Sequence, residues 1–299
     1  MQLNHWIDAS RPRTLPLAFS STLLGSFLAY SDRPFKVPVL ILALLTTLFL
    51  QILSNLANDY GDSMNGMDNE HRVGPKRSVQ SGAIEAKAML IAIVITSLLT
   101  LTSGILLIAY GFDFNISAGF IVFFLLGLSA LGAAIKYTVG SNPYGYSGFG
   151  DLFVYIFFGL TGVLGTYYLH TGTLNYILLL PASAVGLLST AVLNLNNMRD
   201  IEGDARSGKR TLAVILGSQK AHRYHLALVA VAWICFLLYT ILTFHSFIQL
   251  GYLITLPFFI IHLRKVFTTT PPAALDPQLR QLALATFATV LLFGLGLMM

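Results

Sequence analysis

The chain carries little charge. Only 10% of its 299 residues are Asp, Glu, Lys or Arg, and its mean hydropathy is +0.72. A soluble domain usually has about a quarter of its residues charged, so a soluble globular protein is excluded. The apolar runs are continuous and do not alternate with polar residues, which excludes a membrane barrel of strands. The composition therefore predicts an all-α integral membrane protein whose partner is the lipid bilayer.

Cysteine is nearly missing as well, since Cys235 is the only one. One thiol forms neither an intramolecular disulfide nor a thiolate metal cluster, and we interpret it as a packing residue. The seven His are scattered through the sequence, which argues against a zinc site. The net charge of +5 is explained by loops that face anionic lipid, so it indicates no nucleic-acid partner.

Nine apolar segments have about the 20 residues that a membrane-spanning helix needs. They are roughly 14–31, 37–57, 86–110, 114–135, 151–169, 174–195, 222–244, 247–263 and 279–298. If the N-terminus is cytoplasmic, all 18 Lys and Arg except Arg33 and Lys36 fall on the cytoplasmic side. The positive-inside rule requires this asymmetry. We therefore expect one membrane domain over residues 1–299, with cytoplasmic loops at 58–85 and 196–221.

Two polar, acid-rich patches interrupt the apolar sequence. The first reads NLANDYGDSMNGMD over residues 55–68, and the second reads NLNNMRDIEGD over residues 194–204. In both, Asn and Asp recur four residues apart, a spacing that places them on one face of a helix. Asp and Asn also cap or solvate helix ends, but the same spacing in two separate patches favours a shared role. A Gly-led basic turn follows each patch, which suggests a weak internal repeat.

Carboxylates on two converging helix ends suit a divalent metal. Mg²⁺ prefers oxygen ligands and is typically held by one or two carboxylates together with substrate phosphates. Basic residues beside the acids would neutralise the remaining phosphate charge. The patches therefore predict a Mg²⁺-dependent site for a phosphorylated ligand. Arg11 and Arg13 before the first span are either ligand contacts or topology signals.

The same residues carry a family resemblance. NDYGDSMNGMD with HRVGPKRSVQSG behind it, and NNMRDIEGDARSGKRTLAVILG over residues 196–217, resemble the two signatures of the UbiA-type intramembrane prenyltransferases. Within that family, the first motif and the segment over residues 144–168 are most similar to the branch that prenylates 1,4-dihydroxy-2-naphthoate in menaquinone synthesis. Asp151 stands where that branch is expected to have Glu, which leaves the role of this position open.

The resemblance implies nine helices around a central, cytoplasm-facing cavity in a bacterial inner membrane, with Mg²⁺ as cofactor. The substrates would be a polyprenyl diphosphate and an aromatic acceptor that loses its carboxylate as CO₂. The catalytic and metal-binding candidates are Asp59, Asp62, Asp68, Asp200 and Asp204. Asp68 is also a substrate-binding candidate, together with Asn58, Arg72, Arg77, Lys136, Tyr137, Asn196, Asn197, Lys209 and Arg210.

Three alternatives remain open. A UbiA-type enzyme could use another acceptor, such as 4-hydroxybenzoate or homogentisate. A CDP-alcohol phosphotransferase is also helical and acidic, but its Asp-Gly-x-x-Ala-Arg signature is matched only superficially by residues 202–206. A transporter usually binds its substrate near mid-membrane on broken helices, whereas these acids lie at helix ends.

Overall fold

The computed structural model describes residues 3–32, 35–67 and 77–299, and every regular element in these ranges is helical. The elements are α1 (Leu3–Ser10), η1 (Pro12–Thr14), α2 (Leu15–Asp32), α3 (Val37–Met64), α4 (Ala86–Gly111), α5 (Ala118–Lys136), η2 (Tyr144–Tyr146), α6 (Gly150–Val154), η3 (Tyr155–Gly165), α7 (Thr166–Thr171), η4 (Tyr176–Leu178), α8 (Leu179–Arg199), α9 (Ile201–Arg206), α10 (Leu212–Leu216), α11 (Ser218–Leu242), η5 (Phe247–Thr255), α12 (Leu256–Thr268), η6 (Pro272–Leu275) and α13 (Asp276–Leu297). The all-α membrane fold predicted from composition is confirmed.

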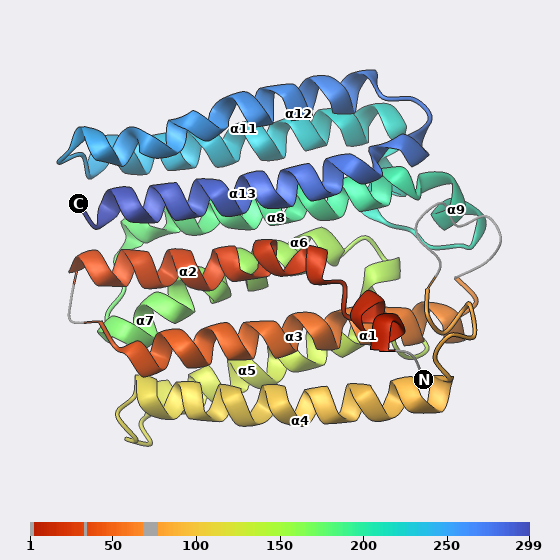
Figure 1. The fold of residues 1–299 in the computed structure, drawn as a ribbon, viewed down its shortest axis with the longest axis horizontal. Coiled ribbons are helices and arrows are strands. Elements are labelled where there is room, and N and C mark those ends of the chain that lie inside the picture. Colours follow the sequence, from red (N-terminus) through yellow and green to blue (C-terminus); the bar gives the residue numbers. More distant parts are fainter. Residues whose placement is uncertain (1–2, 33–34, 68–76) are drawn as a thin grey trace.

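Eight helical segments in the described ranges are long and apolar enough to cross a membrane. The helix α2 runs beside them and makes the ninth crossing, but it is less apolar because Ser and Thr interrupt its sequence. Successive crossings run in opposite directions, so α1 and the C-terminal end of α13 lie at opposite ends of the bundle (Figure 1). The end that carries α1 and α9 is called the motif end below.

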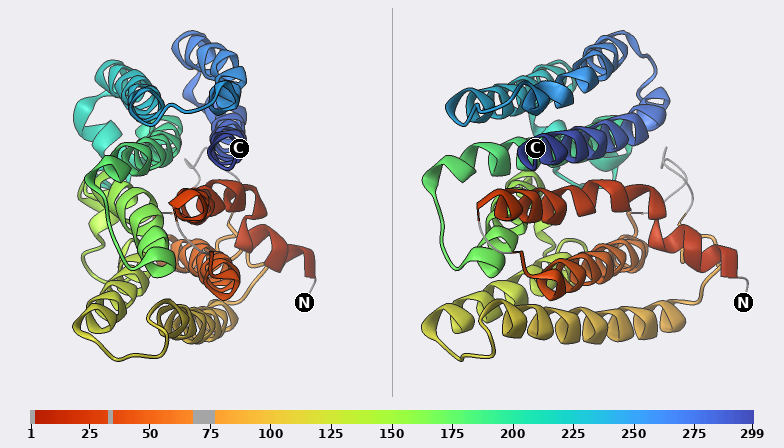
Figure 2. Two further views of the ribbon diagram at one scale, coloured as in Figure 1. Left: turned by 90° about the vertical axis from the view of Figure 1, so that its left-hand side faces the viewer. Right: turned by 60° about the vertical axis from the view of Figure 1, so that its left-hand side comes forward.

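The helices form two packed groups. One group is centred on α8, α11, α12 and α13, around buried residues such as Leu188, Phe236 and Phe293. The smaller group joins α3, α4 and α5 around Leu53 and Met89. Helix α2 and the continuous crossing α6–η3–α7 lie between the two groups, as the end-on view of Figure 2 shows. The two groups thus enclose the middle of the bundle, where the cavity lies.

Gly61 allows a close approach at the motif end. A Cβ added there would lie 2.6 Å from the carbonyl oxygen of Thr138 and 2.7 Å from its hydroxyl oxygen. This contact brings the last turns of α3 against the segment that follows α5. Because Gly61 precedes Asp62, the close packing also fixes where that carboxylate lies.

We expect Gly61→Ala to destabilise the protein by about 1–3 kcal/mol, because the added methyl overpacks a backbone contact that cannot move easily. Gly132→Ala on α5 is the matched control, since no atom lies within 4 Å of a Cβ added there. Thermal unfolding in detergent measures both. An unchanged unfolding temperature for Gly61→Ala would contradict the close packing.

Candidate active site

Both acidic patches lie on helices at the motif end. Helix α3 continues to Met64, beyond the predicted end of the second span, so Asn58 and Asp62 share one helical face. Helix α8 continues to Arg199, and α9 begins directly after Asp200. The ends of α3 and α8 lie at the same end of the bundle (Figure 1). The predicted helical face is therefore confirmed for Asn58 and Asp62, whereas the second motif is divided, because Asp200 lies at the junction between α8 and α9.

A cavity of about 440 Å³ lies between the two helix groups, and residues of both motifs line it. From the first motif these are Asn55, Asn58 and Asp62, and from the second they are Asn196, Asn197 and Lys209, whereas Asp59, Asp200 and Asp204 are not among them. Arg77 and Tyr137 also line this polar part of the cavity. The tertiary fold thus brings together residues that are more than 130 positions apart in the sequence.

Asp62 is the carboxylate of the first motif that faces the cavity, and it is 1% exposed. Its carboxylate forms an ion pair with Arg77 and accepts a hydrogen bond of 2.5 Å from the Tyr146 hydroxyl. Burial, followed by the nearby Asp62 charge, raises the pKa of the Tyr146 phenol, so Tyr146 remains a hydrogen-bond donor. A buried acid held by one cation and one phenol is well placed to bind a charged ligand.

Asp59 faces another side of α3. Its two carboxylate oxygens accept hydrogen bonds from the backbone N–H groups of Ser78 and Val79, at 3.0 and 3.1 Å. The reason is geometric, because a residue next to Asn58 is rotated by about 100° around the helix axis. Asp59 therefore ties α3 to the segment that carries Arg77. Its predicted role in metal binding stays a prediction.

Tyr137 follows α5, and its phenol interacts electrostatically with acids of both motifs. Burial raises the pKa of its phenol well above the ordinary value, and the charges of Asp151, Asp62 and Asp204 raise it further. Asp62 belongs to the first motif and Asp204 to the second. The neutral phenol thus lies within the electrostatic reach of both. Nearby, the Thr138 hydroxyl donates to Asn58 Oδ1 at 3.1 Å.

Arg199 organises the second motif, and sequence reasoning missed it. The side chain is 3% exposed, and its Nε and Nη2 donate to the two oxygens of Asp200 at 3.0 and 2.7 Å. Nη2 also donates to Asn196 Oδ1 at 2.8 Å, and Nη1 donates to Asp276 at the start of α13 at 2.5 Å. Its position between Asn196 and Asp200 was the available sequence signal.

Lys209 carries positive charge from the turn after α9 into the cavity. Its Nζ lies 3.8 Å from Asp204 Oδ1 and 5.3 Å from the centroid of the Tyr146 ring. The Gly208 backbone has a positive φ of 79°, which suits glycine and turns the chain back toward the cavity. The predicted Gly-led basic turn is therefore present after the second motif.

Other predicted residues lie elsewhere. Lys136 and Arg210 are exposed and do not line the cavity, although the backbone N–H of Arg210 donates to the carbonyl of Tyr146 at 3.0 Å. Asp68 and Arg72 fall outside the described residues. Asp151 is 5% exposed but is not among the residues that line the cavity. The proposed roles of the predicted site residues stay predictions.

A comparison with known proteins identifies the family. The UbiA prenyltransferase family model matches residues 18–287. The chain belongs to the UbiA prenyltransferase family. It is 44% identical over 299 residues to a 1,4-dihydroxy-2-naphthoate octaprenyltransferase of Haemophilus influenzae, covering 99% of this chain and 96% of the relative. Its identity to the Escherichia coli protein of the same name is also 44%, covering 98% of this chain and 94% of that protein.

Solved structures confirm the UbiA fold. The apo structure of a UbiA homolog from Aeropyrum pernix K1 has a TM-score of 0.66 at 18% identity, covering 99% of this chain and 98% of that one. A UbiA homolog from Archaeoglobus fulgidus bound to DMAPP and Mg²⁺ has a TM-score of 0.61 at 16% identity, covering 96% of this chain and 98% of that one. Distant members of the UbiA family thus bind Mg²⁺.

The donor atoms of this UbiA chain fit Mg²⁺. Among the residues that the structure describes, no group of three or more His, Cys, Asp and Glu is arranged to hold a metal ion. Mg²⁺ does not require such a cage, since it keeps several waters and combines one or two carboxylates with substrate phosphates. Asp62, Asn58 and Asn196 supply oxygen donors at the polar part of the cavity. These are the hard oxygen ligands that Mg²⁺ prefers.

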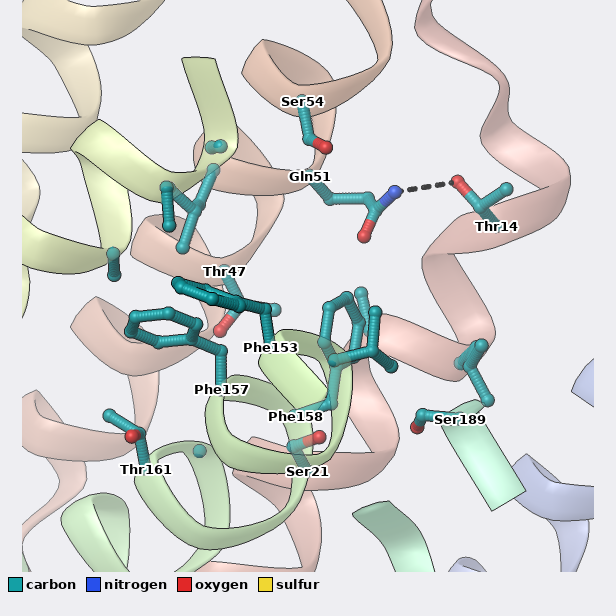
Figure 3. A pocket seen from close by; sticks show the side chains of 18 of the residues that line it. Thr14, Ser21, Thr47, Gln51, Ser54, Phe153, Phe157, Phe158, Thr161 and Ser189 are labelled. Carbon is teal, nitrogen blue, oxygen red and sulfur yellow. Dashed lines mark hydrogen bonds between the residues drawn. The ribbon is translucent and has the colours of Figure 1, made fainter. Parts of the chain in front are cut away.

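The rest of the cavity lining is largely apolar and aromatic, with Ser, Thr and Gln side chains among it, and it also includes Arg11, Arg13 and Arg280. It extends along α3 from Asp62 to Ala43, a span of 19 residues and about 28 Å of helix. Phe153, Phe157 and Phe158 project into it from α6 and η3 (Figure 3). A ligand with a charged head group at the motif end and a long apolar tail along α3 would fit this cavity.

Proposed function

We infer that this chain transfers a polyprenyl group from a polyprenyl diphosphate to 1,4-dihydroxy-2-naphthoate, with loss of CO₂, as a step of menaquinone synthesis. The observation that carries this proposal is the 44% identity over 99% of the chain to a 1,4-dihydroxy-2-naphthoate octaprenyltransferase. The cavity supports it, since one polar end and one long apolar part match a prenyl diphosphate. The proposal treats residues 1–299 as one catalytic membrane domain.

We propose that residues of the two motifs bind the diphosphate from opposite sides. Bound Mg²⁺ would neutralise the diphosphate and make it a better leaving group. The residues proposed to hold it are Asp62, Asp200 and Asp204, helped by Asn58, Asn196, Asn197, Asp59 and Asp68. Arg77 and Lys209 line the cavity beside them and would stabilise charge that develops on the departing diphosphate. Arg72, Lys136 and Arg210 are proposed to add further positive charge for the diphosphate.

The reaction breaks the bond between the first prenyl carbon and the diphosphate oxygen, and the electron pair leaves with the diphosphate. The electron-rich acceptor ring supplies the pair for the new carbon–carbon bond. When the carboxylate departs as CO₂, the pair from its bond returns to the ring and restores aromaticity. Phe153, Phe157 and Phe158 present π faces that stabilise an allylic cation, and the apolar walls keep water from capturing it.

We propose that the motif end faces the cytoplasm. All Lys and Arg residues except Arg33 and Lys36 lie in the segments that share this side. Lys36 lies instead beside the loop that joins α4 to α5, where its Nζ lies 3.0 Å from Asp113 at the opposite end of the bundle. The positive-inside rule assigns the end with more basic residues to the cytoplasm.

The test is an acceptor panel with purified protein, Mg²⁺ and octaprenyl diphosphate. We expect 1,4-dihydroxy-2-naphthoate to give a prenylated product that has lost the mass of CO₂, and 4-hydroxybenzoate and homogentisate to react at least a hundredfold more slowly. Mass spectrometry of the products measures both transfer and decarboxylation. A preference for another acceptor would overturn the substrate assignment, and no turnover of any acceptor would overturn the enzyme assignment in favour of a transporter.

A further inference from the structure

Two hydroxyl groups in the cavity have no hydrogen-bond partner. Ser21 on α2 and Ser189 on α8 are 3% and 2% exposed, and both line the cavity, as Figure 3 shows. Within the described residues, the Oγ atom of neither side chain makes a hydrogen bond. A buried polar group without a partner is costly, and such groups are rare in native proteins. A bound ligand with polar groups would satisfy both.

Neighbouring hydroxyls behave differently. Ser20, next to Ser21, donates to the carbonyl of Pro16 at 2.9 Å. Thr190, next to Ser189, donates to the carbonyl of Gly186 at 2.9 Å. Bonding to the carbonyl four residues back is the usual solution for a hydroxyl on a membrane helix. Ser21 and Ser189 also line the cavity, but the hydroxyl of neither makes this bond.

The depth of the Ser189 hydroxyl matches the reacting ring and not the diphosphate. Ser189 precedes Asn196 by seven residues on α8, which places it about 10 Å farther from the motif end. Asn196 lines the polar part of the cavity that receives the diphosphate. The first prenyl carbon follows the diphosphate, and the acceptor ring must lie against that carbon. A group about 10 Å deeper is therefore beside the ring.

The surroundings of the two hydroxyls suit a flat, uncharged ring. Phe158 supplies an aromatic side chain to the same cavity as Ser21 and Ser189. The cavity-lining neighbours of the two serines in sequence, which are Ala18, Thr22 and Val192, are uncharged. A phenolic hydroxyl needs only one donor or acceptor, which a serine hydroxyl supplies.

We propose that Ser21 and Ser189 bind the phenolic hydroxyl groups of the aromatic acceptor and so orient the ring toward the prenyl carbon. The proposal rests on the proposed function, because it deepens the acceptor assignment. A serine hydroxyl both donates and accepts, so each Oγ accepts a hydrogen bond from a phenol. Accepting that bond also raises the electron density of the ring. The chemical class of the ligand is a hydroxylated bicyclic arene.

The test compares Ser21→Ala and Ser189→Ala with Ser20→Ala as the matched control. We expect each cavity variant to raise the KM for 1,4-dihydroxy-2-naphthoate about five- to tenfold, because one hydrogen bond to the substrate is lost. The KM for octaprenyl diphosphate should stay within twofold of wild type. Ser20→Ala should leave both KM values unchanged. An acceptor KM within twofold of wild type in both cavity variants would overturn the proposal.

A second measurement uses an analogue and does not depend on turnover. The analogue is 1-hydroxy-2-naphthoate, which lacks the 4-hydroxyl group. Replacing the serine that binds the 4-hydroxyl group should leave the inhibition constant of this analogue unchanged. Replacing the other serine should raise that constant five- to tenfold. Equal effects of both variants on this inhibitor would contradict the assignment of one hydroxyl to each serine.

Stability separates a binding role from a structural one. Since both hydroxyls lack a partner, their removal should not lower the unfolding temperature, whereas Ser20→Ala should lower it. If Ser21→Ala and Ser189→Ala both unfolded earlier than wild type, the hydroxyls would be structural and the proposal would fail. Wild-type protein that does not convert 1,4-dihydroxy-2-naphthoate would instead refute the proposed function itself.

Discussion

Asp62→Asn is expected to lower kcat/KM for prenyl transfer about a thousandfold. The substitution keeps the shape of the side chain but removes the one negative charge that the described part of the first motif, residues 55–67, contributes to the cavity lining. Removing a single well-placed group that stabilises transition-state charge costs about 10²- to 10³-fold, and loss of a metal ligand belongs at the upper end of that range. Steady-state kinetics over a Mg²⁺ titration measures the effect, and the Mg²⁺ concentration for half-maximal rate should rise.

Asp113→Asn is the matched control for Asp62→Asn. Asp113 lies at the opposite end of the bundle, where its carboxylate pairs with Lys36 at 3.0 Å. Its backbone φ is 50°, a conformation that Asn tolerates well. We expect Asp113→Asn to keep wild-type kinetics. If Asp62→Asn retained more than a tenth of wild-type kcat/KM, Asp62 would not be the metal ligand of the first motif.

Arg199→Met is expected to lower kcat/KM about a hundredfold and the free energy of unfolding by about 3 kcal/mol. The variant keeps the length of the apolar stem but removes all four hydrogen bonds that the guanidinium makes to Asp200, Asn196 and Asp276. Removing one partner of a buried ion pair costs about 3–5 kcal/mol, and we take the lower end because Asp276 is partly exposed. Thermal unfolding with and without Mg²⁺ and diphosphate measures the stability term.

Arg199→Lys distinguishes charge from geometry. Lysine restores the positive charge but cannot form the two parallel bonds that the guanidinium makes to Asp200. We expect this variant to recover most of the stability and only part of the activity. If Arg199→Met bound Mg²⁺ and diphosphate as tightly as wild type, the network would be structural only and would not position the second motif.

The architecture was predictable because hydropathy reports it directly. Continuous apolar runs of about 20 residues leave helices as the main solution in lipid, since every backbone polar group must then be bonded within its own segment. The helix ends were less predictable. The second span was expected to end at residue 57, but α3 continues to Met64, because a helix does not need apolar side chains once it leaves the bilayer.

The candidate residues were predictable as a group and not as individuals. The four-residue spacing correctly placed Asn58 and Asp62 on one face, and that face lines the cavity. The same spacing does not predict the partners of Asp59, whose carboxylate oxygens accept hydrogen bonds from the backbone N–H groups of Ser78 and Val79. The spacing predicts on which face of a helix a side chain lies. It does not predict which part of the protein that face contacts.

Long-range partners were not predictable from a single sequence. Asp276 lies 77 residues from Arg199, and Tyr146 lies 84 residues from Asp62. The sequence around Ser21 and Ser189 gave no signal that these two serines, among many on membrane helices, would lack hydrogen-bond partners. Such facts depend on which helices pack together and at what rotation.

The sequence by itself determined a membrane-embedded helical protein with two acidic, Mg²⁺-compatible motifs, because burial in lipid and helical periodicity act locally along the chain. Only the tertiary structure decided that the motifs share one cavity, that Arg199 joins α8 to α13, and that Ser21 and Ser189 line the cavity with hydroxyls that make no hydrogen bond within the described residues. Those outcomes arise from helix packing, in which glycines such as Gly61 and the volumes of distant side chains set the position of each face.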